Sequence, residues 1–322
     1  MAAAAPPGAS GLSVLVLTGP TGTGKSDWAL RAAATHPVEI VSVDSAMVYR
    51  GLDIGSAKPA PALRARIPHH LIDICDPTES YSAGRFVADA AACIIEIHDR
   101  GHIPLLVGGT FLYLRALVSG LARLPQASVA LRRELGERAA QVGWGALHNE
   151  LKQLDPAAAA RIHPNDPQRI QRALEVCLST GKPLSALQRA SPSALAGYRV
   201  RRWALVPQDR AALYERLAER FKTMMTHGFL GEVETLYRRG DLSAAHPALR
   251  AVGYRQLWAH LDAASTLSEA VERGIAATRQ LAKRQLTWIR SDPTLAHIEP
   301  HAPGAFEQWN QQLAEELRAL GR

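Results

Sequence analysis

Residues 12–26 read LSVLVLTGPTGTGKS, an apolar run that passes directly into a glycine-rich segment. Gly19, Gly24, Lys25 and Ser26 satisfy the pattern G-x-x-x-x-G-K-[ST]. The glycines let the backbone curl so that its N–H groups point at anionic oxygens, and a following helix adds the positive end of its dipole. The stretch therefore predicts a P-loop, and the identity of the bound phosphate compound has to come from the rest of the chain.

Each part of this loop has a predicted task. Lys25 supplies a mobile positive charge, and the hydroxyl of Ser26 is the candidate ligand for Mg²⁺. We assign the whole loop to diphosphate binding, namely Gly19, Pro20, Thr21, Gly22, Thr23, Gly24, Lys25 and Ser26.

Around the loop, short apolar runs alternate with helical spacing, which predicts an α/β fold with a P-loop-containing parallel sheet flanked by helices. The expected strands are LSVLVLT (12–18), VEIVSVD (38–44), HHLIDIC (69–75), IPLLVGG (103–109) and, much later, RRWALVP (201–207). Two helical stretches, 26–36 and 82–101, fall between the early strands.

From residue 121 to about 200 only helical patterns occur, broken by Gly and Pro. We interpret this part as an all-helical insert domain. The P-loop core then comprises 14–120 and 201–290, with helices again after the returning strand. Residues 1–13 are expected to be a disordered tail, and 291–322 a C-terminal tail.

Composition argues against several classes of protein. No apolar run approaches the roughly 20 residues of a membrane-spanning helix, so no membrane association is expected. Cys75, Cys93 and Cys177 show no CxxC spacing, which fits a reducing cytoplasm and argues against a disulfide framework or a zinc site. Nothing in the sequence requires more than a monomer.

The net charge of +7 is unevenly distributed. Residues 14–120 carry −1, 121–200 carry +5, 201–290 carry +6 and 291–322 carry −3. A basic region suggests a polyanionic partner. A solvated Arg-rich surface is the alternative.

Asp44 stands at the carboxyl end of the second expected strand, where ligands bind in open α/β sheets. A carboxylate beside a diphosphate can hold a metal through water or accept a proton from an incoming nucleophile. It can also simply cap the helix that follows.

Seven motifs appear in one order, and together they resemble the bacterial tRNA dimethylallyltransferase family over residues 14 to 290. They are GPTGTGKS, VDSAMVYRGLDIGSAKP, HHLIDICDPTESYSAGRF, IPLLVGGTFLYLRAL, RIHPNDPQRIQRALEV, ALRAVGYRQLW and GIAATRQLAKRQLTWIR.

The resemblance implies transfer of a dimethylallyl group from dimethylallyl diphosphate to the exocyclic N6 amine of an adenosine in tRNA. In this family the adenosine lies 3′-adjacent to the anticodon of tRNAs that read codons beginning with U. The P-loop would then hold an allylic diphosphate in place of a nucleotide, with Mg²⁺ as cofactor, and the insert would bind the anticodon stem-loop.

By the same resemblance, Asp44 is the expected proton acceptor, and Lys25, Thr110 and Arg220 complete the catalytic group. Arg220 suits the diphosphate because a guanidinium pairs with two phosphate oxygens, although a solvated position on a helix face is the alternative. Thr110 could instead cap a helix.

The expected tRNA contacts fall into four clusters. Basic and aromatic residues suit single-stranded RNA because phosphates pair with the former and bases stack on the latter. Tyr254 and Trp288 could equally belong to the core, which we favour for Trp288. The assigned contacts are Asp44, Ser45, Ala46, Met47 and Thr110; Gln168, Arg169, Ile170, Gln171 and Arg172; Arg250, Gly253, Tyr254 and Arg255; and Lys283, Arg284, Gln285 and Arg290.

Three other functions compete with this one. A P-loop kinase or NTPase would bind and hydrolyse ATP, and an adenylate isopentenyltransferase would act on a free nucleotide. A non-catalytic RNA-binding module would leave Lys25 and Asp44 unexplained. The +11 carried by residues 121–290 favours tRNA over a free nucleotide.

Overall fold

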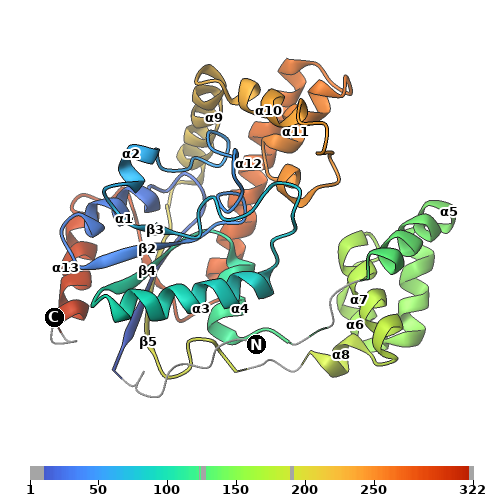
Figure 1. The fold of residues 1–322 in the computed structure, drawn as a ribbon, viewed down its shortest axis with the longest axis horizontal. Helices are drawn as coiled ribbons and strands as arrows, with labels where there is room; N and C mark the ends of the chain where they lie inside the picture. Colours follow the sequence, from blue (N-terminus) through green and yellow to red (C-terminus); the bar gives the residue numbers. More distant parts are fainter. Residues whose placement is uncertain (1–10, 123, 125–127, 189–191, 319–322) are drawn as a thin grey trace. The chain divides into compact units, whose positions relative to one another are not determined.

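The computed structural model describes residues 11–122, 124, 128–188 and 192–318 (Figure 1). The chain divides into two compact units, Met1–Val118 with Ala194–Arg322, and Ser119–Ser193. The helical unit therefore ends before residue 200, because residues 199 to 205 already form a strand of the sheet. Of the expected N-terminal tail, residues 1–10 lie outside the described part, whereas Ser13 begins the first strand.

In the part of the chain that the structure describes, the strands form one six-stranded sheet in which every neighbouring pair is parallel. The strand order is β3-β2-β4-β1-β5-β6. The strands are β1 (Ser13–Thr18), β2 (Val38–Val43), β3 (His69–His70), β4 (Ile103–Gly108), β5 (Arg199–Leu205) and β6 (Ala296–Ile298).

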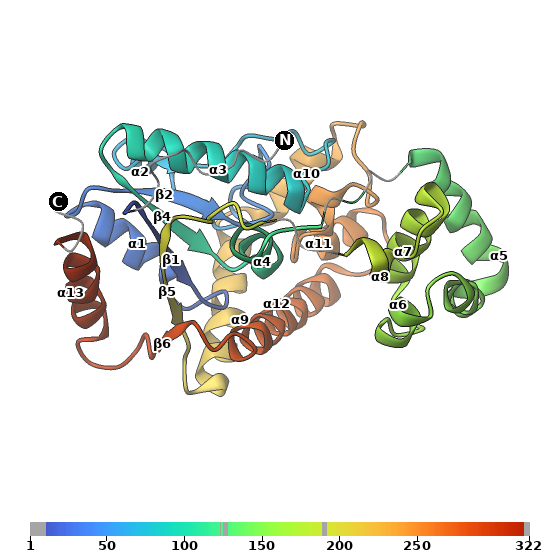
Figure 2. The ribbon, with the colours of Figure 1, turned by 90° about the horizontal axis from the view of Figure 1, so that it is seen from below.

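Both faces of the sheet are covered, which explains why every residue of its central strands β1, β2 and β4 is buried. On one face, Val14, Val16 and Leu106 pack against α3 (Ala83–Asp99) and α4 (Phe111–Ser119). On the other, Leu15 and Leu105 pack with α1 (Lys25–Ala33) and α13 (Ala305–Arg318) (Figure 2). The predicted α/β class is confirmed.

The expected strand at 69–75 is wrong beyond its first two residues. Leu71 and Asp73 have φ values of +62° and +57°, so the backbone leaves the extended region at once. The carboxylate of Asp73 instead accepts hydrogen bonds from Lys58 and Arg64, which fastens the loop after β2 to this segment.

The expected C-terminal tail is also wrong. Residues 296–298 pair with β5, and α13 packs against the sheet. Trp309 is fully buried, with its ring 5.4 Å from that of Trp28 and 6.1 Å from that of Trp203. The physical reason is the apolar series Ala305, Trp309, Leu313 and Leu317, which forms one buried helix face.

The remaining helices of this unit gather beyond the carboxyl ends of the strands (Figure 1). They are α9 (Arg210–Thr226), α10 (Phe229–Tyr237), α11 (Tyr254–Leu261) and α12 (Leu267–Arg290), with a 3-10 turn at Pro247–Arg250. The short α2 (Pro61–Arg64) does not belong to this group, because it lies in the segment that leads into the amino end of β3 (Figure 1).

The second unit is helical, with its own core. Its helices are α5 (Val129–Leu154), α6 (Pro156–Arg161), α7 (Pro167–Thr180) and α8 (Leu184–Leu187). Gly143 breaks α5 with φ 79° and ψ 157°, as the separate helical patterns before and after it predict. Leu135, Leu151 and Leu174 are among the residues that fill the core.

None of the helices in the described part of the chain combines the length and apolar character that crossing a membrane requires.

Candidate active site

The register of the sheet aligns the carboxyl ends of three neighbouring strands, β1, β4 and β2. Gly108 at the end of β4 lies opposite Thr18 of β1 on one side and Val43 of β2 on the other. The P-loop, Asp44 and Thr110 follow these three residues directly or within two positions. No side chain fits at Gly108, because a Cβ there would lie 2.1 Å from the carbonyl oxygen of Val43.

The P-loop has the backbone that its glycines predict. Gly22 and Gly24 have φ values of +81° and +82°, and Gly24 is the N-cap of α1. Thr23 is buried, and its hydroxyl donates to the Pro20 carbonyl oxygen at 2.9 Å. Thr23 therefore shapes the loop from behind, whereas Thr21 and Ser26 face the cavity.

Two cations face this loop. Burial lowers the pKa of Lys25 to about 8, while Asp44 raises it and the neighbouring Arg220 lowers it. Burial also lowers the pKa of Arg220, and Asp44 opposes that shift. An anion between the two cations would relieve both their desolvation and their mutual repulsion. The alternative of a solvated Arg220 on a helix face is wrong, because Arg220 is half-buried and lines the cavity.

One carboxylate oxygen of Asp44 caps the turn that follows it. Its Oδ1 accepts from the amides of Ala46 at 2.8 Å and Met47 at 3.2 Å, as a capping residue does. Within the described residues, no hydrogen bond is made to Oδ2 and no cation lies within ion-pair distance of the carboxylate. The capping role and an acceptor role for Oδ2 are therefore compatible.

Thr110 reaches across to the same turn. Its Oγ1 accepts from the Ser45 amide at 3.1 Å and donates to the Ser45 hydroxyl at 3.4 Å. Thr110, two residues after β4, and the turn after β2 thus form one polar rim.

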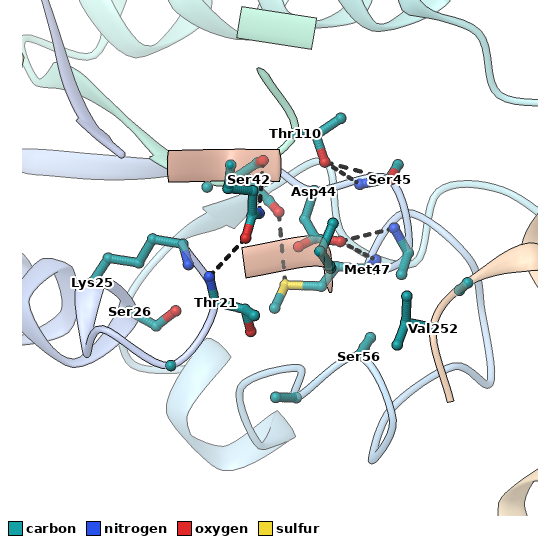
Figure 3. Close-up of a pocket in the computed structure, with 18 of the residues that line it drawn as sticks. Thr21, Lys25, Ser26, Ser42, Asp44, Ser45, Met47, Ser56, Thr110 and Val252 are labelled. Carbon is teal, nitrogen blue, oxygen red and sulfur yellow. Dashed lines mark hydrogen bonds between the residues drawn. The ribbon is translucent and has the colours of Figure 1, made fainter. Parts of the chain in front are cut away.

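These groups line one cavity of about 650 Å³, a size that suits a small-molecule ligand. Figure 3 shows Thr21, Lys25 and Ser26 on one side, Ser56 and Val252 on the other, and Asp44 with Met47 between them. The remaining lining includes apolar side chains of α9 and α12, among them Leu217, Phe221, Met224 and Leu281.

Gln285 of α12 connects the two halves of this site. It is buried, accepts from the Thr21 amide at 2.9 Å and donates to the Gly109 carbonyl oxygen at 2.9 Å. The prediction of Gln285 as an RNA contact needs correction, because both ends of its amide bind the protein itself.

The other predicted RNA contacts of this unit are divided. Arg250 and Arg284 line the cavity and are exposed, whereas Arg255, Lys283 and Arg290 are exposed outside it.

Gly253 and Tyr254 are buried, which corrects the expectation of direct contact for Gly253. The hydroxyl of Tyr254 donates to Glu232. Trp288 is half-buried and lines the cavity, so the preference for a core position was wrong. The Arg115 guanidinium lies 5.5 Å from the centre of its ring.

All five predicted RNA contacts of the helical unit, residues 168–172, belong to α7. Gln168 and Arg169 are exposed. Ile170 is fully buried in the core of the unit, so its side chain cannot touch RNA. Gln171 donates to the Arg132 carbonyl oxygen, and Arg172 lies 3.5 Å from the buried carboxylate of Glu175.

Sequence reasoning missed Glu232 and Phe229, and it did not connect the 55–57 and 250–252 segments, which line the same cavity. These segments are far apart in the sequence, and no spacing pattern links them. The motifs GLDIGSAKP and ALRAVGY contain these two segments, but only the fold shows that they meet.

Ser26 has the hard oxygen that Mg²⁺ prefers, and its side chain is exposed to the cavity. Within the described residues, no group of three or more His, Cys, Asp or Glu could hold a metal ion. The donor set therefore fits a cation that takes most of its oxygens from a diphosphate and water.

Comparison with known proteins gives one consistent result. The family model described as IPP transferase matches residues 47–292. The chain is 54% identical to the tRNA dimethylallyltransferase of Methylococcus capsulatus over 306 residues, which is 95% of this chain and 97% of that protein.

Solved structures agree. A tRNA isopentenylpyrophosphate transferase from Bacillus halodurans has a TM-score of 0.69 and 35% identity, covering 96% of this chain and 98% of that one. A eukaryotic dimethylallyltransferase, solved in snapshots of its action on tRNA, has a TM-score of 0.75 and 27% identity, covering 95% of this chain and 77% of that one.

Proposed function

The chain belongs to the IPP transferase family, and we propose that it transfers a dimethylallyl group from dimethylallyl diphosphate to an adenosine amine of tRNA. One observation of the structure supports this most directly. The P-loop with Lys25 and Arg220 shares a single cavity with Asp44, whose Oδ2 faces no donor among the described residues.

One half of the proposed reaction is the departure of the diphosphate leaving group. The bond between the allylic carbon and the diphosphate oxygen breaks, and negative charge builds on the departing diphosphate. We assign the stabilisation of that charge to Lys25, Arg220 and the loop amides, which line the cavity. Mg²⁺ held at Ser26 would supply further charge stabilisation.

The acceptor is a weak nucleophile, because the lone pair of the adenine amine is delocalised into the ring. As the new bond from N6 to the allylic carbon forms, the amine must lose a proton. We assign this proton to the Asp44 carboxylate, a general-base step. Ser45 and Thr110 form the polar rim beside it and would orient the base.

The adenosine next to the anticodon is the proposed target, in tRNAs that read codons beginning with U. A base in an anticodon loop must leave its stack to enter a cavity. The exposed Arg250 and Arg284 at the cavity, and separately Arg169 on α7, suit contacts with RNA phosphates.

We also propose that the chain acts as a monomer in the cytoplasm. Cys75, Cys93 and Cys177 are free thiols, as a reducing compartment requires.

The deciding experiment measures label transfer from dimethylallyl diphosphate, with Mg²⁺, to an anticodon stem-loop with adenosines at and after the last anticodon position. We expect transfer to this RNA, and none when its target adenosine is replaced by guanosine. Labelling of free AMP instead would favour the nucleotide transferase, and ATP hydrolysis without prenyl transfer would refute the proposal.

A further inference from the structure

One side of the cavity is built from two segments that are distant in the sequence. Residues 55–57 follow the turn after β2, and residues 250–252 precede α11. Both line the cavity on the side of Asp44 away from Lys25, as Ser56 and Val252 show (Figure 3). We call these two segments the acceptor wall, because they lie beyond Asp44 from the diphosphate loop.

A single carboxylate holds the two segments together. Oε2 of Glu232, in the first turn of α10, accepts from the amides of Asp53 at 3.0 Å and Ile54 at 2.6 Å. Its Oε1 accepts from the Gly55 amide at 3.2 Å and from the Tyr254 hydroxyl at 2.5 Å. Both oxygens therefore bind the flanks of the acceptor wall, and every one of these partners is a donor.

An aromatic ring of the same helical turn fills the space beside this carboxylate. A Cβ at Gly55 would lie 2.2 Å from the Phe229 ring, and one at Gly253 would lie 2.7 Å from it. The Tyr254 ring packs edge-on at 4.9 Å from Phe229. The two segments thus meet on one ring, and Glu232 supplies the polar part of the same junction.

A separate anchor holds the loop to its own neighbourhood. The buried Lys58 ammonium donates to the Tyr49 carbonyl oxygen and to the carboxylates of Asp53 and Asp73. These contacts fix the base of the loop near β2 and β3. Glu232 adds the connection from this loop to α10 and α11, which Lys58 does not contact.

We propose that Glu232 is a positioning residue that sets the acceptor wall and so aligns the target base with Asp44. The inference rests on the proposed function and adds a residue that touches neither substrate. Because the P-loop and Arg220 are not part of this wall, the diphosphate half of the site should not depend on Glu232.

Glu232→Gln tests this with little change in volume. The glutamine NH₂ is a donor, so it faces amides or the Tyr254 hydroxyl that need an acceptor. Glu234→Gln is the matched control, since Glu234 lies two residues along α10 and pairs with Arg238 at the surface. Tyr254→Phe removes one donor and leaves the backbone contacts in place.

The experiment measures kcat and KM for the anticodon stem-loop, and pyrophosphate affinity with Mg²⁺ by calorimetry, on the full chain. For Glu232→Gln, kcat/KM for the stem-loop should fall roughly tenfold or more. Pyrophosphate affinity should stay within about twofold. Tyr254→Phe should reduce kcat/KM in the same direction by less, and Glu234→Gln should match the unmodified chain.

Three results would overturn the inference. Unchanged kcat/KM in Glu232→Gln would show that the wall does not need the carboxylate. An equal loss of pyrophosphate affinity would show general structural damage. If Glu232→Gln does not fold, unchanged kcat/KM in Tyr254→Phe would decide against it. Absence of transfer by the unmodified chain would instead refute the proposed function, and the inference with it.

Discussion

The amide of Thr21 donates to the side chain of Gln285 at 2.9 Å, across 264 positions of the sequence. The same side chain donates to the carbonyl oxygen of Gly109, one residue before Thr110. There is no room for a larger residue at 109, because a Cβ would lie 2.3 Å from the Gln285 amide nitrogen. A single buried amide therefore sets the distance between the diphosphate loop and the acceptor rim.

Replacing Gln285 by Ala should weaken pyrophosphate binding about tenfold, since two buried backbone groups lose their partner. Gln285→Glu keeps an acceptor for the Thr21 amide, but it sets a buried carboxylate against the Gly109 carbonyl oxygen and beside the diphosphate loop, so it should weaken binding at least as much as Gln285→Ala. Calorimetry with pyrophosphate and Mg²⁺ measures both. Thr287→Ala, exposed on the same helix, is the control, and an equal affinity in all variants would contradict the bridging role.

Asp44→Asn should lower turnover by roughly a hundredfold to ten-thousandfold, the range for losing a general base. Its amide oxygen can still accept from the Ala46 and Met47 amides, so the turn should persist and stem-loop affinity should change little. Single-turnover transfer and RNA binding are measured side by side, with exposed Asp99→Asn as control. If affinity collapses with turnover, Asp44 is a binding residue and not a base.

Lys25 should make diphosphate binding depend on pH in the alkaline range. Its pKa of about 8 means that the ammonium is charged below pH 8 and loses its proton above it. A bound diphosphate favours the charged form, so the complex should take up a proton when it forms near pH 8 to 9. Apparent affinity at pH 9 should be about tenfold lower than at pH 7 for this reason alone.

Calorimetry in buffers of different ionisation enthalpy measures this proton uptake. The Lys25→Arg variant stays charged over this pH range, so any pH dependence that it shows comes from the titration of pyrophosphate itself. Subtracting it from that of the unmodified chain leaves the contribution of Lys25. Equal pH dependence in the two proteins would show that Lys25 does not titrate in this range. Arg220→Gln should shift the midpoint to higher pH, because Arg220 lowers the pKa of Lys25.

Short sequence patterns predicted the parts of this site that are formed by consecutive residues. The apolar strand before Gly19 and the glycine pattern define the P-loop without help from the rest of the chain. Asp44 and Thr110 follow expected strands, so parallel pairing alone places them at one edge. The ends of the strands are where sequence reasoning and structure agree most closely.

Contacts between distant segments could not be predicted in the same way. Gln285 and Glu232 act on backbone groups of Thr21 and residues 53–55, and backbone amides have no sequence signature. Ile170 lies in a motif rich in basic residues, and its burial follows from the apolar face of α7. The expectation of a tail after residue 290 did not take account of the apolar residues at 305, 309, 313 and 317, whose spacing predicts a helix with one buried face.

Arg169 and Arg172 should test whether the helical unit contacts RNA phosphate. Arg169 is 68% exposed, and Arg172 retains partial exposure beside Glu175. Replacing both by Ala should weaken stem-loop binding and reduce the slope of log affinity against log salt by about 1.4 to 1.8, since each lost phosphate contact contributes about 0.7 to 0.9. Binding titrations at several salt concentrations measure the slope, and an unchanged slope would exclude phosphate contact by these residues.

Trp309→Ala should destabilise the sheet unit by about 3–5 kcal/mol, the usual cost of removing a large buried side chain. The indole is fully buried between Trp28, Trp203 and Phe306, on the face of the sheet that α1 also covers. Urea unfolding followed by fluorescence measures the change, with exposed Gln311→Ala as control. Because the last two P-loop residues, Lys25 and Ser26, form the start of α1, the loss should also reduce pyrophosphate affinity at temperatures near unfolding. A chain that keeps its full stability without Trp309 would mean that α13 is a dispensable tail after all.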